Sequence, residues 1–434
     1  MLARMPQIRR PVVHRRLPWT AAPETVLRAL AGEDLPVMVP TGRGPSIVAA
    51  RPSTVAVGTD VWEALDIPCS PHTVHPTGFA GGWLGLLADG IAGSVEVLPA
   101  APPDPGGPPP AIVGRYPTLA IVTPAGEITI ASTDGVAALD RFERDLTARV
   151  AALPARDRPE APPVGAVITS SLTARDYRAA VDRIRDYIRN GDCYQVNLTQ
   201  RLVAPWDGTP IAFADRLWAA AGPSSHRAYL GLREGTVVSA SPELLVRVRG
   251  QVAESEPIKG TAPVGEWPRL RVSVKDRSEH VMIVDLIRND LGRVAVAGGV
   301  SVPRLFDRLR TPYVEHMVST VRATLADDVT VTGVLRAVFP GGSVTGTPKV
   351  RSLEIIRELE PVSRGPAFGS MIAVSPAGDI EASVAIRTAW VTDSEVRYWC
   401  GGAVVWDSDP DAELTEALAK ATPFLRALEV RWDG

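Results

Sequence analysis

The stretch TARDYRAAVDRIRDYIRNG (residues 173–191), followed by DCYQVNLTQRLV (192–203), decides the fold class. In its first part, apolar side chains recur every three or four residues, which predicts a helix with one buried stripe. Thr173 suits the start of this helix and Gly191 its end. The stripe comprises Tyr177, Ala180, Val181, Ile184, Tyr187 and Ile188.

The second part of the stretch alternates with a period of two, which predicts a strand. One face carries Tyr194, Val196 and Leu198, and the other carries Gln195, Asn197 and Thr199. An uncharged polar row within apolar sequence is either a solvated face or the floor of a cavity. The stretch therefore predicts a helix that leads directly into a strand.

Further elements follow on both sides of this stretch. Periodicity predicts helices over 278–294, 347–361 and 411–428, while short strands such as SIVAARP (46–52) and TLAIVT (118–123) make the first part β-rich. Two proline-rich stretches, 98–117 and 153–166, are expected to be exposed connectors, because proline cannot donate to a sheet. We therefore expect an N-terminal β-rich region (1–152), a connector (153–166) and a second region (167–430), the two regions packed as one unit.

Composition excludes several classes of protein. The formal net charge of −3 over 434 residues gives no reason to expect nucleic acid or an anionic membrane as partner. The sequence contains no run of eighteen apolar residues, so we expect no membrane span. The basic N-terminal stretch, residues 1–19, lacks the apolar segment of a secretory signal. Cys69, Cys193 and Cys400 lie far apart in the chain, which fits a reducing cytoplasm and argues against disulfides or a zinc site.

Three groups of residues are candidates for chemistry. Glu279 and Glu416 lie near the starts of separate predicted helices, where they either bind a hard cation such as Mg²⁺ or simply complement the helix dipoles in solvent. FPGGSVTGTPK (339–349) places glycine backbone N–H groups and Lys349 at the start of a predicted helix. These groups either bind an anion or the glycines simply form turns. The stretch lacks the GxxxxGK[ST] motif of a nucleotide-binding P-loop. Arg387 offers a bidentate fork for a carboxylate, or else forms a salt bridge.

ESEPIKGTAPVG (254–265) places Lys259 between two prolines, with three carboxylates nearby. A solvated lysine is the simplest interpretation of such a residue. A lysine that acts as a nucleophile has to be neutral, so its pKa of about 10.4 in water must be lowered by burial or its proton taken by a base.

Taken together, these motifs resemble the chorismate-utilising enzymes, and among them the component I chains of aminodeoxychorismate synthases. The resemblance runs from about Val167 to Leu428. Its motifs, in order, are DCYQVNLTQRL, SASPELLVR, EPIKGTAP, KDRSEHVMIVDLIRNDLGRV, VEHMVSTVRA, FPGGSVTGTPKVRSLEIIRELEP, SVAIRTAWV and GGAVVWDSDPDAELTEALAKA.

The resemblance implies an α+β fold in which large antiparallel sheets form a two-sheet core, flanked by helices and enclosing a cavity. It implies that Glu279, Glu413 and Glu416 hold Mg²⁺, which in turn holds the ring carboxylate of chorismate. His316 matches a catalytic position of the family. The residues implied to bind substrate are Gln195, Thr345, Gly346, Lys349, Arg387, Tyr398, Gly401, Gly402 and Lys420.

Lys259 and Gln195 point to one branch of the family, and Glu243 matches a residue that takes part in its chemistry. Lys259 stands in PIKGT, as in aminodeoxychorismate synthases, whereas anthranilate synthases carry alanine there. Glu243 resembles the acid/base glutamate that helps the C4 hydroxyl of chorismate to leave. Gln195 stands where isochorismate and salicylate synthases carry a lysine that activates water, so addition of water is disfavoured.

The expected activity is therefore Mg²⁺-dependent amination of chorismate to 4-amino-4-deoxychorismate, through a covalent Lys259 intermediate, for 4-aminobenzoate and folate. No GxCxG glutaminase motif is present, so ammonia is expected from a separate glutamine amidotransferase subunit. The alternatives are an anthranilate or aminodeoxyisochorismate synthase component I, or a weakly active chorismate-binding paralogue. Ala367, Ile372 and Ala373 depart from the family pattern, and no acidic element that would bind tryptophan is evident.

Overall fold

The structure is a computed structural model that describes residues 12–42, 44–69, 79–154, 167–310 and 314–430. From residue 155 on, the predicted connector (153–166) lies outside the described residues, as do the first eleven residues of the basic N-terminal stretch. Within the described residues, no helix is long and apolar enough to cross a membrane.

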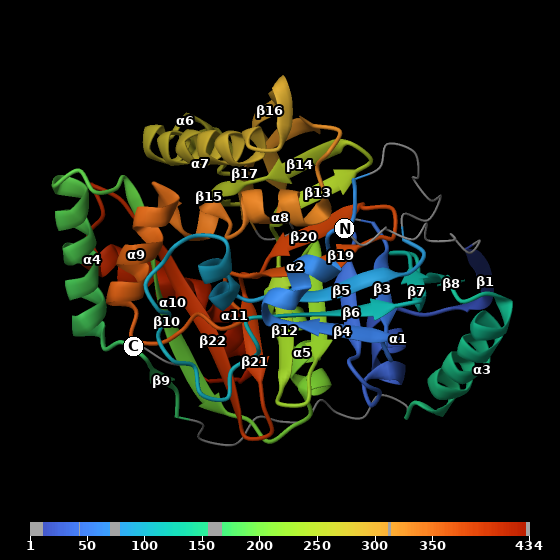
Figure 1. Cartoon of the computed structure of the whole chain (residues 1–434). Coiled ribbons are helices and arrows are strands. Elements are labelled where there is room, and N and C mark those ends of the chain that lie inside the picture. Colours follow the sequence, from blue (N-terminus) through green and yellow to red (C-terminus); the bar gives the residue numbers. More distant parts are fainter. Residues whose placement is uncertain (1–11, 43, 70–78, 155–166, 311–313, 431–434) are drawn as a thin grey trace.

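Two large antiparallel sheets form the centre of the molecule, as predicted (Figure 1). The first has twelve strands, with β9 (Thr169–Ser170) beside β10. Its order is β1 (Val13–Thr20), β8 (Glu127–Ser132), β7 (Thr118–Val122), β3 (Ser46–Ala49), β2 (Val37–Pro40), β11 (His226–Gly231), β12 (Thr236–Ser241), β21 (Thr388–Val391), β22 (Glu395–Val404), β10 (Gln195–Pro205) and β18 (Gly346–Thr347).

The second sheet has ten strands, with β16 (Ala295–Arg310) beside β17. Its order is β15 (Ile258–Pro263), β17 (Val314–Leu325), β14 (Val252–Glu256), β13 (Leu244–Arg249), β20 (Ile380–Val384), β19 (Ser370–Val374), β5 (Gly82–Leu87), β6 (Ala111–Tyr116) and β4 (Thr54–Val57). Strands from the first 152 residues pair with later strands in both sheets, β2 with β11 and β5 with β19. The N-terminal region is thus part of the same two-sheet core.

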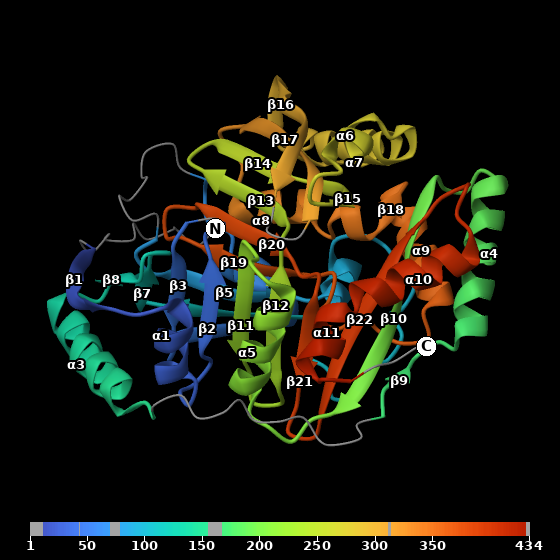
Figure 2. The same ribbon diagram turned by 180° about the vertical axis from the view of Figure 1, so that it is seen from behind.

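Helices cover the outer faces and the ends of the sheets. They are α1 (Pro23–Leu30), α2 (Val61–Ala64), α3 (Val136–Ala152), α4 (Ala174–Arg189), α5 (Pro210–Ala221), α6 (Trp267–Val272), α7 (Val274–Gly292), α8 (Val331–Val338), α9 (Lys349–Leu359), α10 (Pro410–Lys420) and α11 (Thr422–Ala427), with 3₁₀ turns η1 (Gly58–Asp60), η2 (Asp89–Ser94) and η3 (Gly342–Val344). In both ribbon views α4 lies at one end of the molecule and α3 at the other, while α6 and α7 lie over the ten-stranded sheet (Figures 1 and 2).

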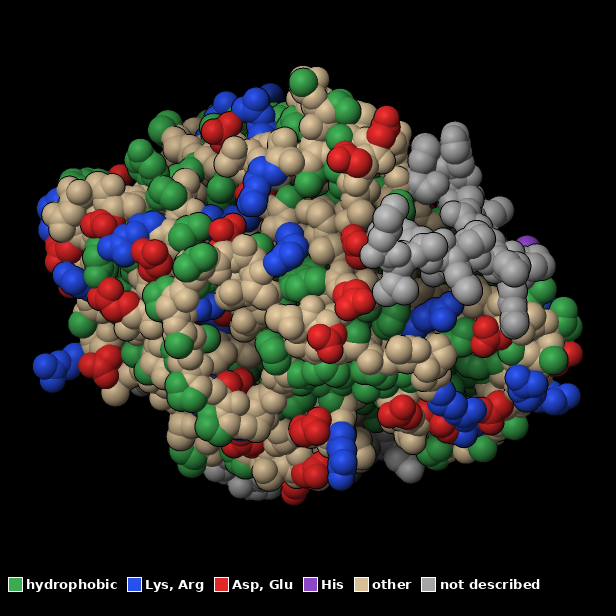
Figure 3. Space-filling view, in the orientation of Figure 1, with side chains coloured by type: hydrophobic (Ala, Val, Ile, Leu, Met, Phe, Trp, Pro, Cys, Tyr) green, Lys and Arg blue, Asp and Glu red, His purple; other side chains and the backbone are tan. Residues whose placement is uncertain are grey.

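Three apolar clusters hold these layers together. The largest joins the facing sides of the two sheets, for example Val237 and Val246. A second packs Phe213 of α5 and Phe424 of α11 on the outer face of the twelve-stranded sheet. A third packs α4, α9 and α10 against the ends of β10 and β22. On the outer surface seen in Figure 3, acidic and basic side chains are intermingled, in keeping with the small net charge.

The stretch with which the sequence analysis began folds as predicted. Thr173 caps α4, and its Oγ1 accepts the N–H of Asp176 at 3.1 Å. Gly191 follows the helix with φ of +83°, in the left-handed region that glycine adopts without strain. Tyr194 differs from the prediction because it precedes β10 and is 69% exposed.

The predicted helix 411–428 is wrong as one element. The structure has two helices, α10 and α11, with Ala421 between them. Pro423 lies in the first turn of α11, where its missing N–H is tolerated, whereas inside a continuous helix it would break a hydrogen bond and clash with the preceding turn. The chain therefore starts a new helix at Thr422.

A buried ion pair joins β10 to the glycine-rich loop 341–348. Arg364, 1% exposed, donates to both oxygens of Glu360 at 2.9 and 2.7 Å. The same guanidinium donates to the carbonyls of Val344 (2.8 Å) and Asn197 (3.0 Å). Glu360 also accepts the backbone N–H and the hydroxyl of Thr199, both at 2.9 Å. This Glu360–Arg364 clamp fixes two backbone segments relative to each other.

Replacing Arg364 with methionine is expected to destabilise the fold by about 3–5 kcal/mol, because it leaves the Glu360 carboxylate buried without its counter-charge. The free energy of unfolding, from urea titration followed by circular dichroism, measures this loss. The double variant Glu360→Leu/Arg364→Met is expected to recover part of it.

The matched control is Arg189→Met, which removes an ion pair to Asp186 whose side chains are about half exposed. Such a surface pair contributes at most about 0.5 kcal/mol. Equal losses in Arg364→Met and Arg189→Met would contradict the assigned role of the clamp.

Candidate active site

A cavity of about 2340 Å³ lies against the ends of β10, β15 and β22 and beneath α7 and α10. Its lining includes most of the residues that the sequence analysis singled out. Glu416 and Lys420 of α10 and Lys275 of α7 are exposed lining residues, so the cavity opens between these two helices. A second arm of the cavity reaches α1 and α5, at Glu24 and Asp215.

Lys259 lies on β15 at the wall of this cavity and is half-buried. Burial lowers the pKa of its amine, because a charged ammonium loses hydration there. The carboxylates of Glu279, Glu243 and Glu416 act in the opposite direction, and Lys420 adds to the lowering. Lys259 is therefore not the solvated lysine of the simplest interpretation.

Glu243 follows β12 and is 5% exposed on the cavity lining. Burial raises its pKa to about 7, against the opposing effects of the Ser343 hydroxyl and Lys259. A carboxyl group with this pKa exists in both protonation states near neutral pH, so it can both give and take a proton.

Three further glutamates line the same cavity. Burial raises the pKa of Glu279 and of Glu413, and Glu413 also accepts a hydrogen bond from Ser408 at 2.6 Å. Glu416 differs: although burial opposes it, the Lys420 ammonium at 2.8 Å holds its pKa below the usual value. The structure thus collects carboxylates from α7 and α10 that are far apart in sequence.

These glutamates suit a hard divalent cation by their chemistry, since Mg²⁺ prefers carboxylate oxygens. A Cβ placed on Gly402 would lie 3.2 Å from Glu413 Oε2 and 3.9 Å from Glu416 Oε1, so both carboxylates border this glycine. Within the described residues, however, no three acidic, histidine or cysteine side chains are close enough to form a metal site. The donor set fits Mg²⁺, and its side chains stand further apart than coordination requires.

Arg387 and His316 also belong to the lining of the cavity. Arg387 lines it, with φ of +50°, and no hydrogen bond or ion pair to its guanidinium is found among the described residues. His316 lies 2.9 Å from the Thr261 hydroxyl, measured from Nδ1. Burial lowers the pKa of His316, and the Arg387 charge lowers it further, which favours the neutral imidazole. Arg387 thus offers its donors to a ligand in the cavity.

The polar row of β10 forms a wall of the cavity rather than a solvated face. Gln195, Asn197 and Thr199 are 0, 8 and 3% exposed, and the latter two line the cavity. Neither amide atom of Gln195 has a hydrogen-bond partner in the described part of the chain. Such a buried amide is expected to bind a ligand or a water molecule.

Lys349 lies in a different environment from the predicted anion cradle. Its ammonium donates to Asp290 of α7 at 2.7 Å, both side chains are buried, and Lys349 is absent from the described lining of the cavity. The neighbouring Thr345 is also behind the wall, where its hydroxyl donates to Gly341 O at 3.1 Å. Gly346 packs so closely that a Cβ would lie 2.1 Å from Gln195 O. These residues shape the wall through backbone contacts.

Tyr398, Gly401 and Gly402 of β22 line the cavity. The Tyr398 hydroxyl donates to Lys420 O at 3.3 Å, and its ring stacks on Phe424 at 4.9 Å between centroids. A Cβ on Gly401 would lie 2.0 Å from Leu198 O, so only glycine fits between β22 and β10. Strand pairing therefore explains this glycine without any ligand.

The sequence analysis did not single out Lys275 or Thr261, both of which line the cavity. Lys275 precedes Glu279 by four residues on α7, so helical spacing could have placed the two on one face. Thr261 is cross-strand neighbour to His316 in the β15–β17 register, a pairing that no local pattern reveals.

The pKa of Lys259 is testable by labelling, because the chain has four lysines: Lys259, Lys275, Lys349 and Lys420. Acetic anhydride reacts with neutral amines, and peptide mass spectrometry follows each site separately. We expect the pH profile of Lys259 acetylation to have its midpoint below the usual 10.5. The Glu279→Gln variant is expected to lower this midpoint further, because it removes the carboxylate that most strongly raises the pKa.

The denatured chain provides the reference, since all four lysines are then in water. A Lys259 profile that coincides in the native and denatured chain would disprove the assigned effect of burial.

Known proteins resemble this chain along most of its length. The model of the chorismate binding enzyme family matches residues 50–426. Aminodeoxychorismate synthase component 1 of Salmonella typhimurium is 35% identical over 400 residues, which cover 88% of this chain and 86% of that protein. Anthranilate synthase component 1 of Streptomyces coelicolor is 37% identical over 377 residues, covering 81% and 73%.

Solved structures agree with this relationship. Anthranilate synthase component I of Streptococcus pneumoniae superimposes with a TM-score of 0.77 and 26% identity, covering 87% of this chain and 91% of that one. The menaquinone-specific isochorismate synthase of Escherichia coli, at 19% identity, shares the fold with a TM-score of 0.72 over 96% of this chain and 94% of its own. The extent of the family match, with the shared fold, shows that the chain belongs to the chorismate binding enzyme family.

Proposed function

We propose that this chain aminates chorismate to 4-amino-4-deoxychorismate, as the synthase component of an aminodeoxychorismate synthase. The observation that carries the proposal is Lys259, a half-buried amine of lowered pKa on the wall of the cavity that also holds Glu243. Relatives named aminodeoxychorismate synthase component 1, at 35% and 42% identity, support this branch of the family.

In the first step the neutral Lys259 amine attacks C2 of chorismate. The two ring double bonds shift, C1=C2 to C6=C1 and C5=C6 to C4=C5, and the C4–O bond breaks. Glu243 in its protonated form gives its proton to the leaving hydroxyl, which departs as water, and the attacking nitrogen becomes a secondary ammonium. The pKa of Glu243, about 7, keeps a sufficient fraction protonated for this role. The intermediate is covalently bound to Lys259 through C2.

In the second step ammonia attacks C4 and both ring double bonds return to their places. The C2–N bond of the secondary ammonium breaks, so Lys259 leaves as a neutral amine, and the Glu243 carboxylate takes back a proton from the new ammonium on C4. The sum of both steps is chorismate plus ammonia to 4-amino-4-deoxychorismate plus water. A lysine of lowered pKa serves both steps, since it is a nucleophile when neutral and a leaving group when protonated.

The remaining cavity residues orient the substrate. Arg387, whose guanidinium has no partner among the described residues, would bind the enolpyruvyl carboxylate together with the backbone of Gly402. Glu279, Glu413 and Glu416 would hold Mg²⁺, which when bound supplies positive charge for the ring carboxylate. Gln195 is fully buried and absent from the described lining, so its amide, which has no partner among the described residues, would act from behind the wall that Asn197 and Thr199 form.

Ammonia would come from a separate glutamine amidotransferase subunit, because the sequence has no glutaminase nucleophile motif. High concentrations of ammonium salt at alkaline pH are then expected to replace that subunit.

A second candidate is anthranilate synthesis, which the relatives of that name at 36–37% identity favour. In that reaction ammonia attacks C2 directly, so a nucleophilic lysine has no role. Lys259 is the residue that separates the two candidates.

Product analysis tests the proposal. The purified chain, with chorismate, Mg²⁺ and ammonia, is expected to give 4-aminobenzoate once an aminodeoxychorismate lyase is added. Lys259→Ala and Lys259→Arg are both expected to lose this product, since arginine keeps the charge but is never neutral. Without ammonia, the intact mass of the wild-type chain should rise by that of chorismate less one water.

Anthranilate from the wild-type chain would refute the proposal in favour of the second candidate. Retention of 4-aminobenzoate formation by Lys259→Ala would instead refute only the covalent route.

Removal of the metal is expected to stop turnover, and Glu279→Gln and Glu416→Gln are expected to raise the Mg²⁺ concentration needed for half-maximal rate by about tenfold or more. Asp285→Asn is the control, because Asp285 lies on the same helix as Glu279 but pairs with Arg288 on the surface. Full turnover in the presence of a strong chelator would contradict the assignment of these glutamates.

A further inference from the structure

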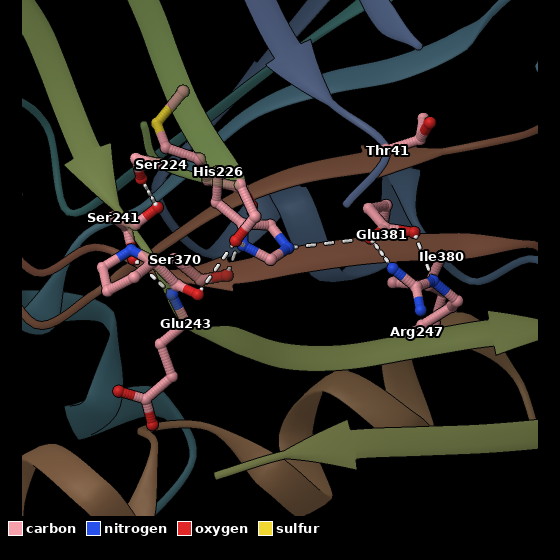
Figure 4. Close-up of polar contacts among 12 residues, drawn as sticks. Thr41, Ser224, His226, Ser241, Glu243, Arg247, Ser370, Ile380 and Glu381 are labelled. Atoms are coloured by element: carbon pink, nitrogen blue, oxygen red, sulfur yellow. Dashed lines mark hydrogen bonds and ion pairs between the residues drawn. The ribbon is translucent and has the colours of Figure 1, made fainter. Parts of the chain in front are cut away.

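A polar cluster is buried between the two sheets, beside the turn that carries Glu243 (Figure 4). At its centre is Glu381 of β20, 1% exposed, which accepts Arg247 at 2.7 and 3.0 Å and Arg249 at 2.8 Å. His226 of β11, 4% exposed, lies on the other side of Glu381. The proposed reaction leaves this cluster without a role.

The His226 ring connects Glu381 to a serine. Its Nε2 is 3.8 Å from Glu381 Oε1, an electrostatic contact longer than a hydrogen bond. Its Nδ1 is 2.9 Å from Ser225 Oγ. The ring thus lies beside the Glu381 carboxylate on one side and is within hydrogen-bond distance of a hydroxyl on the other.

Ser225 in turn holds the turn before Glu243. Its hydroxyl donates to Pro242 O at 3.0 Å. The N–H of Glu243 donates to Ser241 Oγ at 3.2 Å. These two contacts bond both polar groups of the Pro242–Glu243 peptide, the carbonyl of Pro242 and the N–H of Glu243. Proline itself has no N–H that could add a further contact.

The direction of donation in these hydrogen bonds is fixed. A serine hydroxyl has one proton, and Ser225 gives it to Pro242 O, so the contact with His226 requires Nδ1 to be the donor. The Nδ1–H tautomer and the imidazolium both supply this donor, but only the imidazolium also has a proton on Nε2 to direct toward Glu381, and Nε2 has no hydrogen-bond partner among the described residues. In Figure 4 the Glu243 side chain points away from the His226 ring, so the histidine has no direct contact with the carboxyl group that lines the cavity.

We propose that His226 is a positioning residue for Glu243, acting through Ser225 and the Pro242 carbonyl. The ring, which lies beside the Glu381–Arg247 pair, orients the Ser225 hydroxyl, and that hydroxyl sets the carbonyl next to Glu243. The role rests on the proposed function of Glu243 as acid and base. Because proton transfer depends steeply on geometry, a small displacement of this turn reduces kcat more than substrate binding.

The test compares variants of the full chain. His226→Phe keeps a ring of similar size without a donor, and we expect kcat to fall by about tenfold while KM for chorismate changes by less than about twofold. His226→Asn retains a donor near the position of Nδ1 and is expected to restore most of kcat. Ser225→Ala should match His226→Phe, and the double variant should be no worse than either alone, because both remove one contact chain.

Arg249→Gln is the matched control, since it removes one arginine from Glu381 while Arg247 and the Ser225–Pro242 contact remain. Its kcat is expected to equal that of the wild type. A kcat of His226→Phe equal to the wild type, or no recovery in His226→Asn, would overturn the proposal by leaving only a packing role.

A second measurement does not depend on turnover. Hydrogen–deuterium exchange of the peptide 239–246 reports on the Glu243 amide, and we expect it to exchange faster in His226→Phe and Ser225→Ala but not in Arg249→Gln. Unchanged exchange in both variants would overturn the positioning role whatever the activity. If instead Glu243→Gln keeps wild-type turnover while exchange changes as expected, the acid/base role of Glu243 fails and the contact chain stands.

Discussion

The cavity depends on one buried interaction, the Glu360–Arg364 clamp. A salt bridge in the interior is stabilising only when its remaining donors and acceptors are also satisfied. Here the guanidinium holds the carbonyls of Asn197 and Val344, and the carboxylate holds Thr199. The clamp thereby fixes β10 against the loop that carries Ser343, and these two segments form adjoining parts of the cavity wall. The clamp therefore keeps the wall rigid beside the glycine-rich loop, where the glycines have no side chains that could pack and fix the backbone.

Burial shifts the pKa values of the two proposed reacting groups, Lys259 and Glu243, in opposite directions. It lowers the pKa of the Lys259 amine and raises that of Glu243 to about 7, because a charged group of either sign loses hydration. Both groups therefore approach the neutral pH range, one from above and one from below. Opposite charges nearby limit each effect, so the amine and the acid are tuned by the same enclosure and by each other.

The local sequence pattern was sufficient to predict those helices and strands whose apolar periodicity extends over many residues. The helix after Thr173 and the strand after it could be predicted because burial of one face imposes a period that the sequence must follow. The polar row of β10 remained ambiguous, since a period of two is the same for a solvated face and for a cavity wall. The break at Pro423 was missed because the apolar stripe continues across it into α11. Lys349 shows the limit for side chains: its position at a glycine-rich helix start was correct, but its partner Asp290 comes from a distant helix.

The sequence by itself determined the class of fold, the main helices and strands, and the motifs that place the chain in its family. These follow from local periodicity and from residue types at fixed spacing, which the chain carries without reference to its folded shape. Only the tertiary structure decided which side chains share the cavity, that Lys259 is half-buried and Glu243 buried there, and that His226 contacts the serine next to the Glu243 turn. Burial and long-range pairing depend on packing between segments more than a hundred residues apart, such as β10 with β22 and β11 with β2, and no local pattern records those distances.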